Sequence, residues 1–395
     1  MSTEGSPRAG RWAWAEVDLA AIEHNVRQVR AAAAPAAVWA VVKADGYGHG
    51  AVRAAGAALR AGAAGLCVAL VDEGIELRRA GIAAPVLVLS EQPVERLADL
   101  VGSGLAPTVY TPAGVDAVAA AARSAGVQVG VHLKVDTGMQ RVGVRPAEAR
   151  GLAQYVADAA GIALAGISTH LACADEPASS ASAAQLVEFD RVLADLAAAD
   201  LMPPLVHVAN SAGVFTWPDA HRSFVRAGIA IYGISPGPAV DHLVAGLRPA
   251  LALKARVSLV KRVAAGSAIS YGWRHRFDRD TTIATVPLGY ADGVPRRLGT
   301  RPDRAGAEVL LGGRRCPIVG VVTMDQLMVD VGDGDVSVGD EVVLIGEQGG
   351  HRVGVEEWAE HLGTIGYEIV CGISARVPRI EIGDPDGAPG TRRRS

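Results

Sequence analysis

The chain of 395 residues is long enough for two or three domains, which excludes a single small core. Half of the residues are hydrophobic, 20% are charged and only 4% are aromatic. This composition predicts a core of Ala, Val, Leu and Ile and excludes disorder over most of the length. The formal net charge of −4 gives no general attraction to nucleic acid, and the basic residues cluster only at Arg392–Arg394.

The cysteines are far apart in the sequence and form no CxxC pair, which argues against a metal site and against a disulfide framework. They are Cys67, Cys173, Cys316 and Cys371. The first twenty residues lack the apolar segment of a signal peptide, and no apolar run reaches the ~18 residues of a membrane span. We therefore expect a cytoplasmic protein with no bound metal and no membrane partner.

From Val38 onward, short apolar runs alternate with stretches of helical periodicity, a pattern typical of βαβ units. Eight strands with intervening helices inside about 230 residues are typical of an α/β fold, the (β/α)8 TIM barrel, and a doubly wound sheet is the alternative. The candidate strands are Val38–Val42, Leu66–Leu70, Val86–Leu89, Pro107–Tyr110, Val127–Val135, Ala163–His170, Leu205–Ala209 and Phe224–Arg226.

The pattern changes near Asp241–Pro249, where strands joined by Gly/Asp turns predict a second, mostly β domain. Its candidate strands are Leu251–Val260, Thr281–Pro287, Val309–Leu311, Gln326–Val331 and Glu341–Ile345, and its one candidate helix is Val355–Leu362. We therefore predict a disordered N-terminus over residues 1–10, a barrel over 11–247, a β-rich domain over 248–383 and a disordered tail over 384–395.

In a (β/α)8 barrel, the residues that follow the strands line the rim where active sites lie. Taken singly, most polar residues there have an ordinary explanation, such as a solvated lysine, a core histidine or an arginine in an ion pair. Together on one rim they predict a functional site. They are Lys43, Lys134, Arg141, His170, Asn210, Ser211 and Arg226, with Gly228 close behind.

Two features of this rim point to one cofactor. Small residues at Asn210–Gly213 and Gly228–Ile229 offer backbone N–H groups at the corner where barrels frequently bind phosphate. Lys43 directly follows a buried apolar strand, where loss of hydration favours the neutral amine that can form a Schiff base. A phosphate cradle together with such a lysine predicts pyridoxal phosphate.

The segment Val41–Gly50, VVKADGYGHG, resembles the cofactor-lysine signature of the alanine racemase family. Further motifs of that family follow in the same order along nearly the whole chain. They are Lys134–Met139, Ser168–His170, Ala209–Ala212, Arg226–Ile229, Ser270–Gly272, Thr323–Gln326 and Gly366–Ile369, and Ala15–Leu19 precedes them. The resemblance implies a barrel followed by a β domain, which agrees with the two-part pattern.

The resemblance implies a two-base mechanism, in which Lys43 takes the α-proton of D-alanine and Tyr271 that of L-alanine. Racemisation needs one base on each face of the reacting carbon. Tyrosine has a reference pKa near 10 and is a poor base unless its phenolate is stabilised. The family places His170 beside Tyr271 and Arg226 behind it, an arrangement that can supply that stabilisation.

The resemblance also assigns binding residues. Those for the cofactor are Lys43, Tyr47, Asn210, Ser211, Arg226, Gly228, Ile229 and Tyr367, and those for the substrate are Arg141, Met324, Asp325 and Tyr290. Tyr290 and Tyr367 are implied to line the entrance, and from the sequence alone a half-buried core role is equally open for both. Lys134 is implied to carry a carbamate, which would give Arg141 an anionic partner.

Arg226 also bears on the type of reaction. By resemblance it faces the pyridine nitrogen of the cofactor, and a guanidinium can only donate hydrogen bonds. It therefore leaves that nitrogen unprotonated and weakens the electron sink, which favours racemisation over transamination or decarboxylation. An acidic residue at this position would instead indicate aminotransferase-like chemistry.

The expected activity is an alanine racemase, an isomerase that supplies D-alanine for peptidoglycan. One alternative is a racemase of the same scaffold acting on serine or a larger amino acid. Another is a non-catalytic pyridoxal-phosphate carrier, but such single-domain proteins would lack Tyr271, Met324 and Asp325. The family also implies a homodimer in which these β-domain residues reach the barrel of the partner chain.

Overall fold

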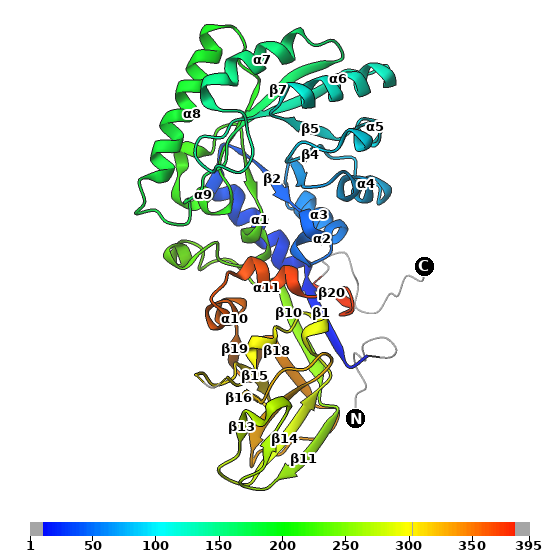
Figure 1. The fold of residues 1–395 in the computed structure, drawn as a ribbon, viewed down its shortest axis with the longest axis vertical. Helices are drawn as coiled ribbons and strands as arrows, with labels where there is room; N and C mark the ends of the chain where they lie inside the picture. The colour runs from blue at the N-terminus through cyan, green and yellow to red at the C-terminus, as the bar shows by residue number, and fades with distance from the viewer. Residues whose placement is uncertain (1–10, 302, 384–395) are drawn as a thin grey trace. The chain divides into compact units, whose positions relative to one another are not determined.

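The structure is a computed structural model that describes residues 11–301 and 303–383. The predicted disordered ends, 1–10 and 384–395, lie outside the described residues. The chain divides into two compact units, of which the first, Ile22–Arg248, is continuous. The second combines residues 11–21 with the described residues of 249–383 (Figure 1).

The first unit contains an eight-stranded parallel sheet in the order β8-β7-β6-β5-β4-β3-β2-β9. The strands are β2 Ala37–Val41, β3 Gly65–Val68, β4 Val86–Val88, β5 Ala106–Val109, β6 Val129–Lys134, β7 Ile162–Ser168, β8 Leu205–His207 and β9 Phe224–Ala227. Ser223 N donates to Val206 O at 2.9 Å and Arg226 N donates to Ala209 O at 2.9 Å, which joins the two ends of the sheet. The predicted barrel is confirmed.

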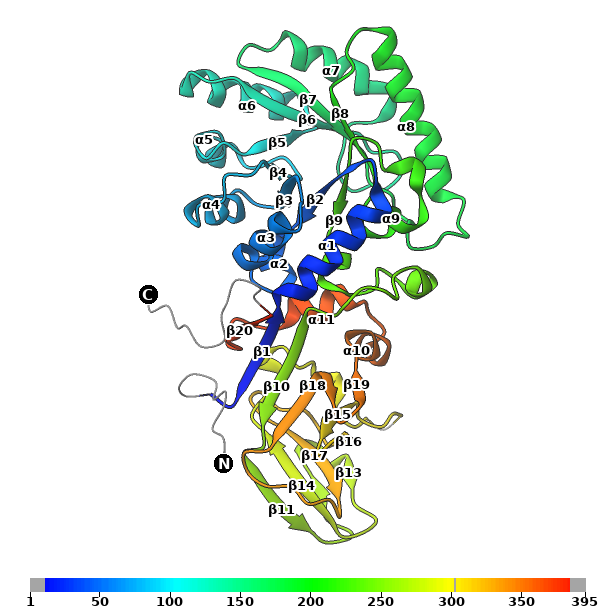
Figure 2. The same ribbon diagram turned by 180° about the vertical axis from the view of Figure 1, so that it is seen from behind.

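Helices connect these strands and surround them (Figure 2). They are α1 Leu19–Ala33, α2 Lys43–Tyr47, α3 Ala51–Arg60, α4 Val71–Arg79, α5 Leu97–Gly102, α6 Pro112–Ala125, α7 Ala149–Asp158, α8 Ala181–Ala198 and α9 Ser211–Thr216. Local chemistry fixes the ends of α6, since Thr111 Oγ1 accepts from Gly114 N and Pro112 occupies the first turn. Gly126 ends this helix at φ +67°, a value that favours glycine.

The second unit is built on a mostly antiparallel sheet in the order β11-β14-β17-β16-β15-β18-β10-β1-β20. The strands are β1 Ala13–Asp18, β10 Leu251–Arg256, β11 Leu259–Val263, β14 Thr281–Val286, β15 Glu308–Leu311, β16 Arg314–Val319, β17 Leu327–Gly332, β18 Glu341–Gln348 and β20 Arg379–Ile382. The short strand β19 His351–Val353 pairs with β18, and β12 Ala268–Ile269 pairs with β13 His275–Arg276. A mostly β second domain is confirmed.

The division differs from the predicted boundary at residue 11. β1 belongs to the β unit, where it pairs antiparallel with β10 and parallel with β20. Its sequence AWAEVD alternates buried and partly exposed positions only toward the end, and its partners lie more than 200 residues away in the chain. Periodicity identifies such a strand but cannot identify its sheet.

Two further elements of the β unit differ from the prediction. The predicted strand Leu251–Val260 is two strands, β10 and β11, which pair with different neighbours. Besides α10 Val355–Leu362 there is a second helix, α11 Gly366–Gly372, which buries Ile369 and Val370. Its seven residues are too few for helical periodicity to be read from the sequence.

Three observations concern the described residues as a set. None of their helices is long and apolar enough to cross a membrane. No group of three or more His, Cys, Asp or Glu among them is placed to hold a metal ion. The four cysteines are free thiols.

Candidate active site

The carboxyl ends of the barrel strands bring together the residues predicted for the rim. Lys43 begins α2 directly after β2, Lys134 ends β6, and His170 lies just beyond β7. Ser211 begins α9 after β8. Arg226 lies within β9 rather than beyond it, so its side chain rises from inside the barrel.

Arg226 is the centre of the polar contacts at this rim. Its side chain is buried and donates to four acceptors: Nη1 to His207 Nδ1 at 2.7 Å, and Nη2 to Thr169 O at 2.9 Å, Val208 O at 2.9 Å and His170 Nδ1 at 3.2 Å. Because a guanidinium only donates, both imidazole Nδ1 atoms must accept. The neutral His170 therefore carries its proton on Nε2.

The contacts of Arg226 continue through two buried histidines. His207 accepts at Nδ1, so its proton lies on Nε2, which donates to His132 Nδ1 at 3.0 Å. Gly166 of β7 makes room for this pair, since a Cβ there would lie 2.3 Å from His132 Nδ1. In the row Arg226–His207–His132, each residue thus donates a hydrogen bond to the next.

Burial and the positive charge of Arg226 keep these histidines neutral. Burial, with the charge of Arg226 second, lowers the pKa of His132 to about 4 and holds the pKa values of His170 and His207 well below 6.5. Burial lowers the pKa of Arg226 to about 10, which leaves it charged at neutral pH. The rim therefore holds a fixed cation supported by neutral rings.

Lys134, Arg141 and His170 line one small pocket beside the rim, together with Asp136, Met139 and Thr169. Burial lowers the pKa of Lys134 to about 7, with further lowering by the charges of Arg226, Arg141 and Lys43. The loop after β6 returns so closely that a Cβ on Gly143 would lie 2.6 Å from Asp136 N. The structure thus brings the predicted Lys134 and Arg141 together.

The residues after Lys43 form an unusual backbone turn. Ala44 to Gly48 have φ values of +53°, +51°, +60°, +54° and +80°, so five successive residues are left-handed. Glu73 Oε1 accepts from Ala44 N at 2.6 Å, and Asp45 Oδ1 accepts from Ala51 N at 2.8 Å. These side-chain contacts hold the turn that follows the predicted cofactor lysine.

Three of the residues predicted to bind the phosphate, Tyr47, Ser211 and Gly228, lie close together. Ser211 Oγ accepts from Gly228 N at 2.8 Å and from Ala230 N at 3.4 Å. A Cβ on Gly228 would lie 2.4 Å from Tyr47 Oη, so only glycine lets these residues approach. Asn210 has a structural contact as well, because its Oδ1 accepts from Gly213 N at 2.9 Å and caps α9.

The remaining predicted residues belong to the β unit and are largely exposed. Tyr271 begins a short 3-10 turn and is 71% exposed, and Met324 is 52% exposed. Tyr290 is 42% exposed, which is more than a core tyrosine would show. A cavity of about 400 Å³ adjoins Tyr290 and is lined also by Arg297, Leu362, Thr364, Glu368 and Ile369. Tyr367 lies in α11 and is half-buried.

Two family models match the chain. The alanine racemase N-terminal domain matches residues 17–236, and the alanine racemase C-terminal domain matches residues 250–381. The chain belongs to the alanine racemase family. The two matched ranges correspond closely to the barrel unit and to the continuous part of the β unit.

Members of the alanine racemase family match over nearly their full length. The alanine racemase of Symbiobacterium thermophilum is 49% identical over 372 residues, covering 94% of this chain and 97% of that protein. The alanine racemase of Thermobifida fusca is 46% identical and covers 94% and 98%.

Solved structures of alanine racemases agree in fold. The enzyme from Streptomyces lavendulae superposes with a TM-score of 0.89 at 38% identity and covers 95% of this chain and 98% of that one. The Bacillus anthracis enzyme, solved with bound L-Ala-P, gives a TM-score of 0.89 at 40% identity and covers 96% and 97%.

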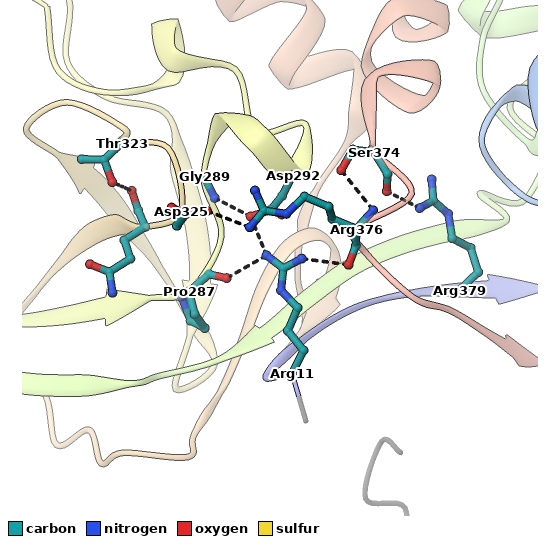
Figure 3. A network of polar contacts seen from close by, with 10 residues as sticks. Arg11, Pro287, Gly289, Asp292, Thr323, Asp325, Ser374, Arg376 and Arg379 are labelled. Atoms are coloured by element: carbon teal, nitrogen blue, oxygen red, sulfur yellow. Dashed lines mark hydrogen bonds and ion pairs between the residues drawn. The ribbon is translucent and has the colours of Figure 1, made fainter. Parts of the chain in front are cut away.

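Two features of this alanine racemase family member lie outside the residues predicted from the sequence. One is the His207–His132 pair, because a histidine within an apolar strand resembles a core residue. The glycine inside β7 is the sequence signal that could have indicated it. The other is the set of ion pairs that Arg11 and Arg376 make with Asp292 in the β unit (Figure 3), which links distant parts of the chain and also reaches the predicted Asp325.

Proposed function

We propose that this protein is an alanine racemase that interconverts L-alanine and D-alanine with pyridoxal phosphate, and so supplies D-alanine for peptidoglycan. Membership of the alanine racemase family over both units supports the reaction. The observation that carries the proposal is the buried Arg226, a cation that only donates, held among neutral histidines at the barrel rim.

The residues at the rim fit pyridoxal phosphate. The Ser211 hydroxyl, the N–H groups near Gly228 and the hydroxyl of Tyr47 form a small cradle suited to a phosphate, closed by a glycine where a Cβ would collide. Lys43 at the end of β2 supplies the amine that would hold the cofactor. When bound, this cofactor withdraws electrons from the amino acid and acidifies its Cα–H.

Arg226 would control which reaction follows. Its four hydrogen bonds fix the guanidinium, and its pKa of about 10 keeps it charged at neutral pH. It can donate a hydrogen bond to an unprotonated ring nitrogen of the cofactor, but it cannot accept one from a protonated ring nitrogen. Electron withdrawal by the cofactor would therefore stay moderate. Moderate withdrawal favours return of the proton to Cα, which is racemisation.

Lys43 and Tyr271 would exchange the proton on opposite faces of Cα. The neutral His170 accepts from Arg226 at Nδ1, and its Nε2–H remains able to donate to the oxygen of Tyr271. Such a hydrogen bond would stabilise the phenolate that acts as base. We place Tyr271 in the site of a partner chain, so that the working enzyme is a homodimer with shared sites.

Arg141, Met324 and Asp325 would bind the carboxylate end of alanine, and Tyr290 and Tyr367 would line the entrance. Arg141 shares its pocket with Lys134, and two cations there would repel each other. A carbamate on Lys134 would replace this repulsion by attraction and orient Arg141 toward the substrate. The carbamate therefore belongs to the proposed mechanism.

Proton–deuterium exchange at Cα tests this function. The purified protein, supplied with pyridoxal phosphate, is mixed with L-alanine in D2O, and exchange and D-alanine formation are followed by NMR and chiral chromatography. We expect both with alanine and much less with L-serine. A serine racemase would reverse that preference, and a non-catalytic carrier would produce neither change.

A further inference from the structure

Two arginines converge on one buried carboxylate in the β unit. Asp292 is fully buried, and its Oδ2 lies 2.6 Å from Arg11 Nη2 and accepts from Gly289 N at 3.1 Å. Its Oδ1 lies 3.3 Å from Arg376 Nε, an ion pair without the geometry of a hydrogen bond. The two cations thus compensate a charge that would be costly to bury alone.

Arg376 differs from Arg11 because it also contacts a second carboxylate. Its Nη2 donates to Asp325 Oδ1 at 2.7 Å, so one guanidinium bridges Asp292 and Asp325. Figure 3 shows Arg376 between these groups and Arg11 approaching from the other side. The turn that carries Arg376 is fixed by Arg379, which donates to the carbonyls of Ile373, Ser374 and Val377.

The loop that contains Asp325 is attached at two places. Backbone N–H groups of Tyr290 and Ala291 donate to the carbonyls of Thr323 and Met324, each at 3.0 Å. A Cβ on Gly289 would lie 2.3 Å from both carbonyl oxygens, so the two segments are in close contact. The side-chain attachment of the loop is the hydrogen bond from Arg376 to Asp325.

We propose that Arg376 is a positioning residue that holds the Thr323–Gln326 loop, with Met324 and Asp325, in the geometry that binds the substrate. This inference rests on the proposed function, which assigns those two residues to the substrate. Arg376 acts through Asp325 and does not touch the substrate itself. A loop that is held less firmly binds the ground state and the transition state more weakly by the same amount. Loss of Arg376 therefore raises KM more than it lowers kcat.

The first test compares two arginines that share Asp292. Arg376→Gln removes the contact with Asp325. The matched control Arg11→Gln removes the cation beside Asp292 and the hydrogen bonds to Arg376 O and Pro287 O, but it leaves the side-chain contact between Arg376 and Asp325 in place. We expect Arg376→Gln to raise KM for alanine roughly fivefold with kcat nearly unchanged, the scale of a half-exposed ion pair. Arg11→Gln lowers stability but keeps KM. An equal rise of KM in both variants would overturn the proposal.

A double-mutant cycle then examines the route of the effect. If Arg376 acts through Asp325, Arg376→Gln changes nothing further once Asp325→Ala has removed the acceptor of its hydrogen bond. KM effects that multiply would mean that Arg376 acts independently of Asp325, and the proposal would be wrong.

Hydrogen exchange supplies a readout that does not depend on activity. The amides of Tyr290 and Ala291, which donate to the loop carbonyls, should exchange faster in Arg376→Gln than in Arg11→Gln. Equal exchange in the two variants contradicts the positioning role. If the unaltered protein fails to racemise alanine, the proposed function is wrong, while this comparison still decides whether Arg376 holds the loop.

Discussion

Lys134 is the residue whose modification is most directly testable. Burial and three neighbouring cations lower its pKa to about 7, so the neutral amine that reacts with CO2 predominates above that pH. We expect a carbamate signal in 13C NMR with labelled bicarbonate at pH 8 and a weaker signal at pH 6, where protons compete for the amine.

Lys254 offers a matched control for the carbamate, since it too is a partly buried lysine but pairs with Glu16 at 2.9 Å. Lys134→Met should remove the signal, and Lys254→Met should leave it. A signal that persists in Lys134→Met would assign the carbamate elsewhere and leave Arg141 without its proposed partner.

Ala44 is an alanine held in the left-handed region, which costs about 1–2 kcal/mol. Ala44→Gly relieves this strain but adds about 0.5–1 kcal/mol of unfolded-state entropy, so we expect a net gain of about 0.5–1 kcal/mol in the free energy of unfolding. Urea denaturation measures it. The same change at exposed Ala120, inside α6, should destabilise by about 1 kcal/mol. If Ala44→Gly also lowered the free energy of unfolding, as Ala120→Gly should, the backbone of Ala44 would not be strained.

At the scale of elements, the strands β6, β8 and β9 carry His132, His207 and Arg226, which form a buried row of basic side chains. This row makes the free energy of unfolding depend on pH. The pKa of His132 is about 4 in the folded protein and near 6.5 when unfolded, so between these values the unfolded chain binds more protons. Stability is therefore complete above about pH 6.5 and falls as the pH approaches 4.

We expect His132 to account for a loss on the order of 3 kcal/mol across that window. His132→Gln retains an acceptor for the Nε2–H of His207 but cannot take up a proton. Its free energy of unfolding, measured by denaturant titration from pH 7 to pH 4, should fall less steeply than that of the unaltered protein. Parallel curves would show that another group controls the acid transition.

Helices and strands could be predicted from the sequence where an apolar run and the turns beside it mark the element within a short segment. Strands such as Val86–Val88 are continuous buried runs, and Lys43 and His170 follow strand ends whose place on one rim is a rule of the barrel. Arg376 and Asp292 could not be predicted, because their pairing joins segments 84 residues apart and no periodicity encodes a partner. The short α11 was missed for lack of length.

At the scale of the whole molecule, the proposed homodimer predicts a complementation result. Lys43→Ala and Tyr271→Phe homodimers should each be nearly inactive, because every site has lost one base. Co-expression of the two variants gives mixed dimers in which one site carries both changes and the other carries neither. With random pairing, roughly a quarter of the full racemase activity should return.

The presence of mixed dimers has to be established independently, by different affinity tags on the two chains and purification over both columns. If doubly purified dimers remain inactive, both bases come from the same chain and the shared site is wrong. Mixing of Lys43→Ala with His170→Ala, two changes on the same barrel, is the control that should restore nothing.

The position of β1 has a consequence for synthesis on the ribosome. This strand lies between β10 and β20, and about 230 residues separate it from the start of β10. At translation rates of roughly 5–20 residues per second, β1 emerges about 10–50 s before its first partner exists. During that interval its backbone donors and acceptors lack their sheet partners on both sides, which makes the nascent chain open to wrong pairings and to chaperone binding.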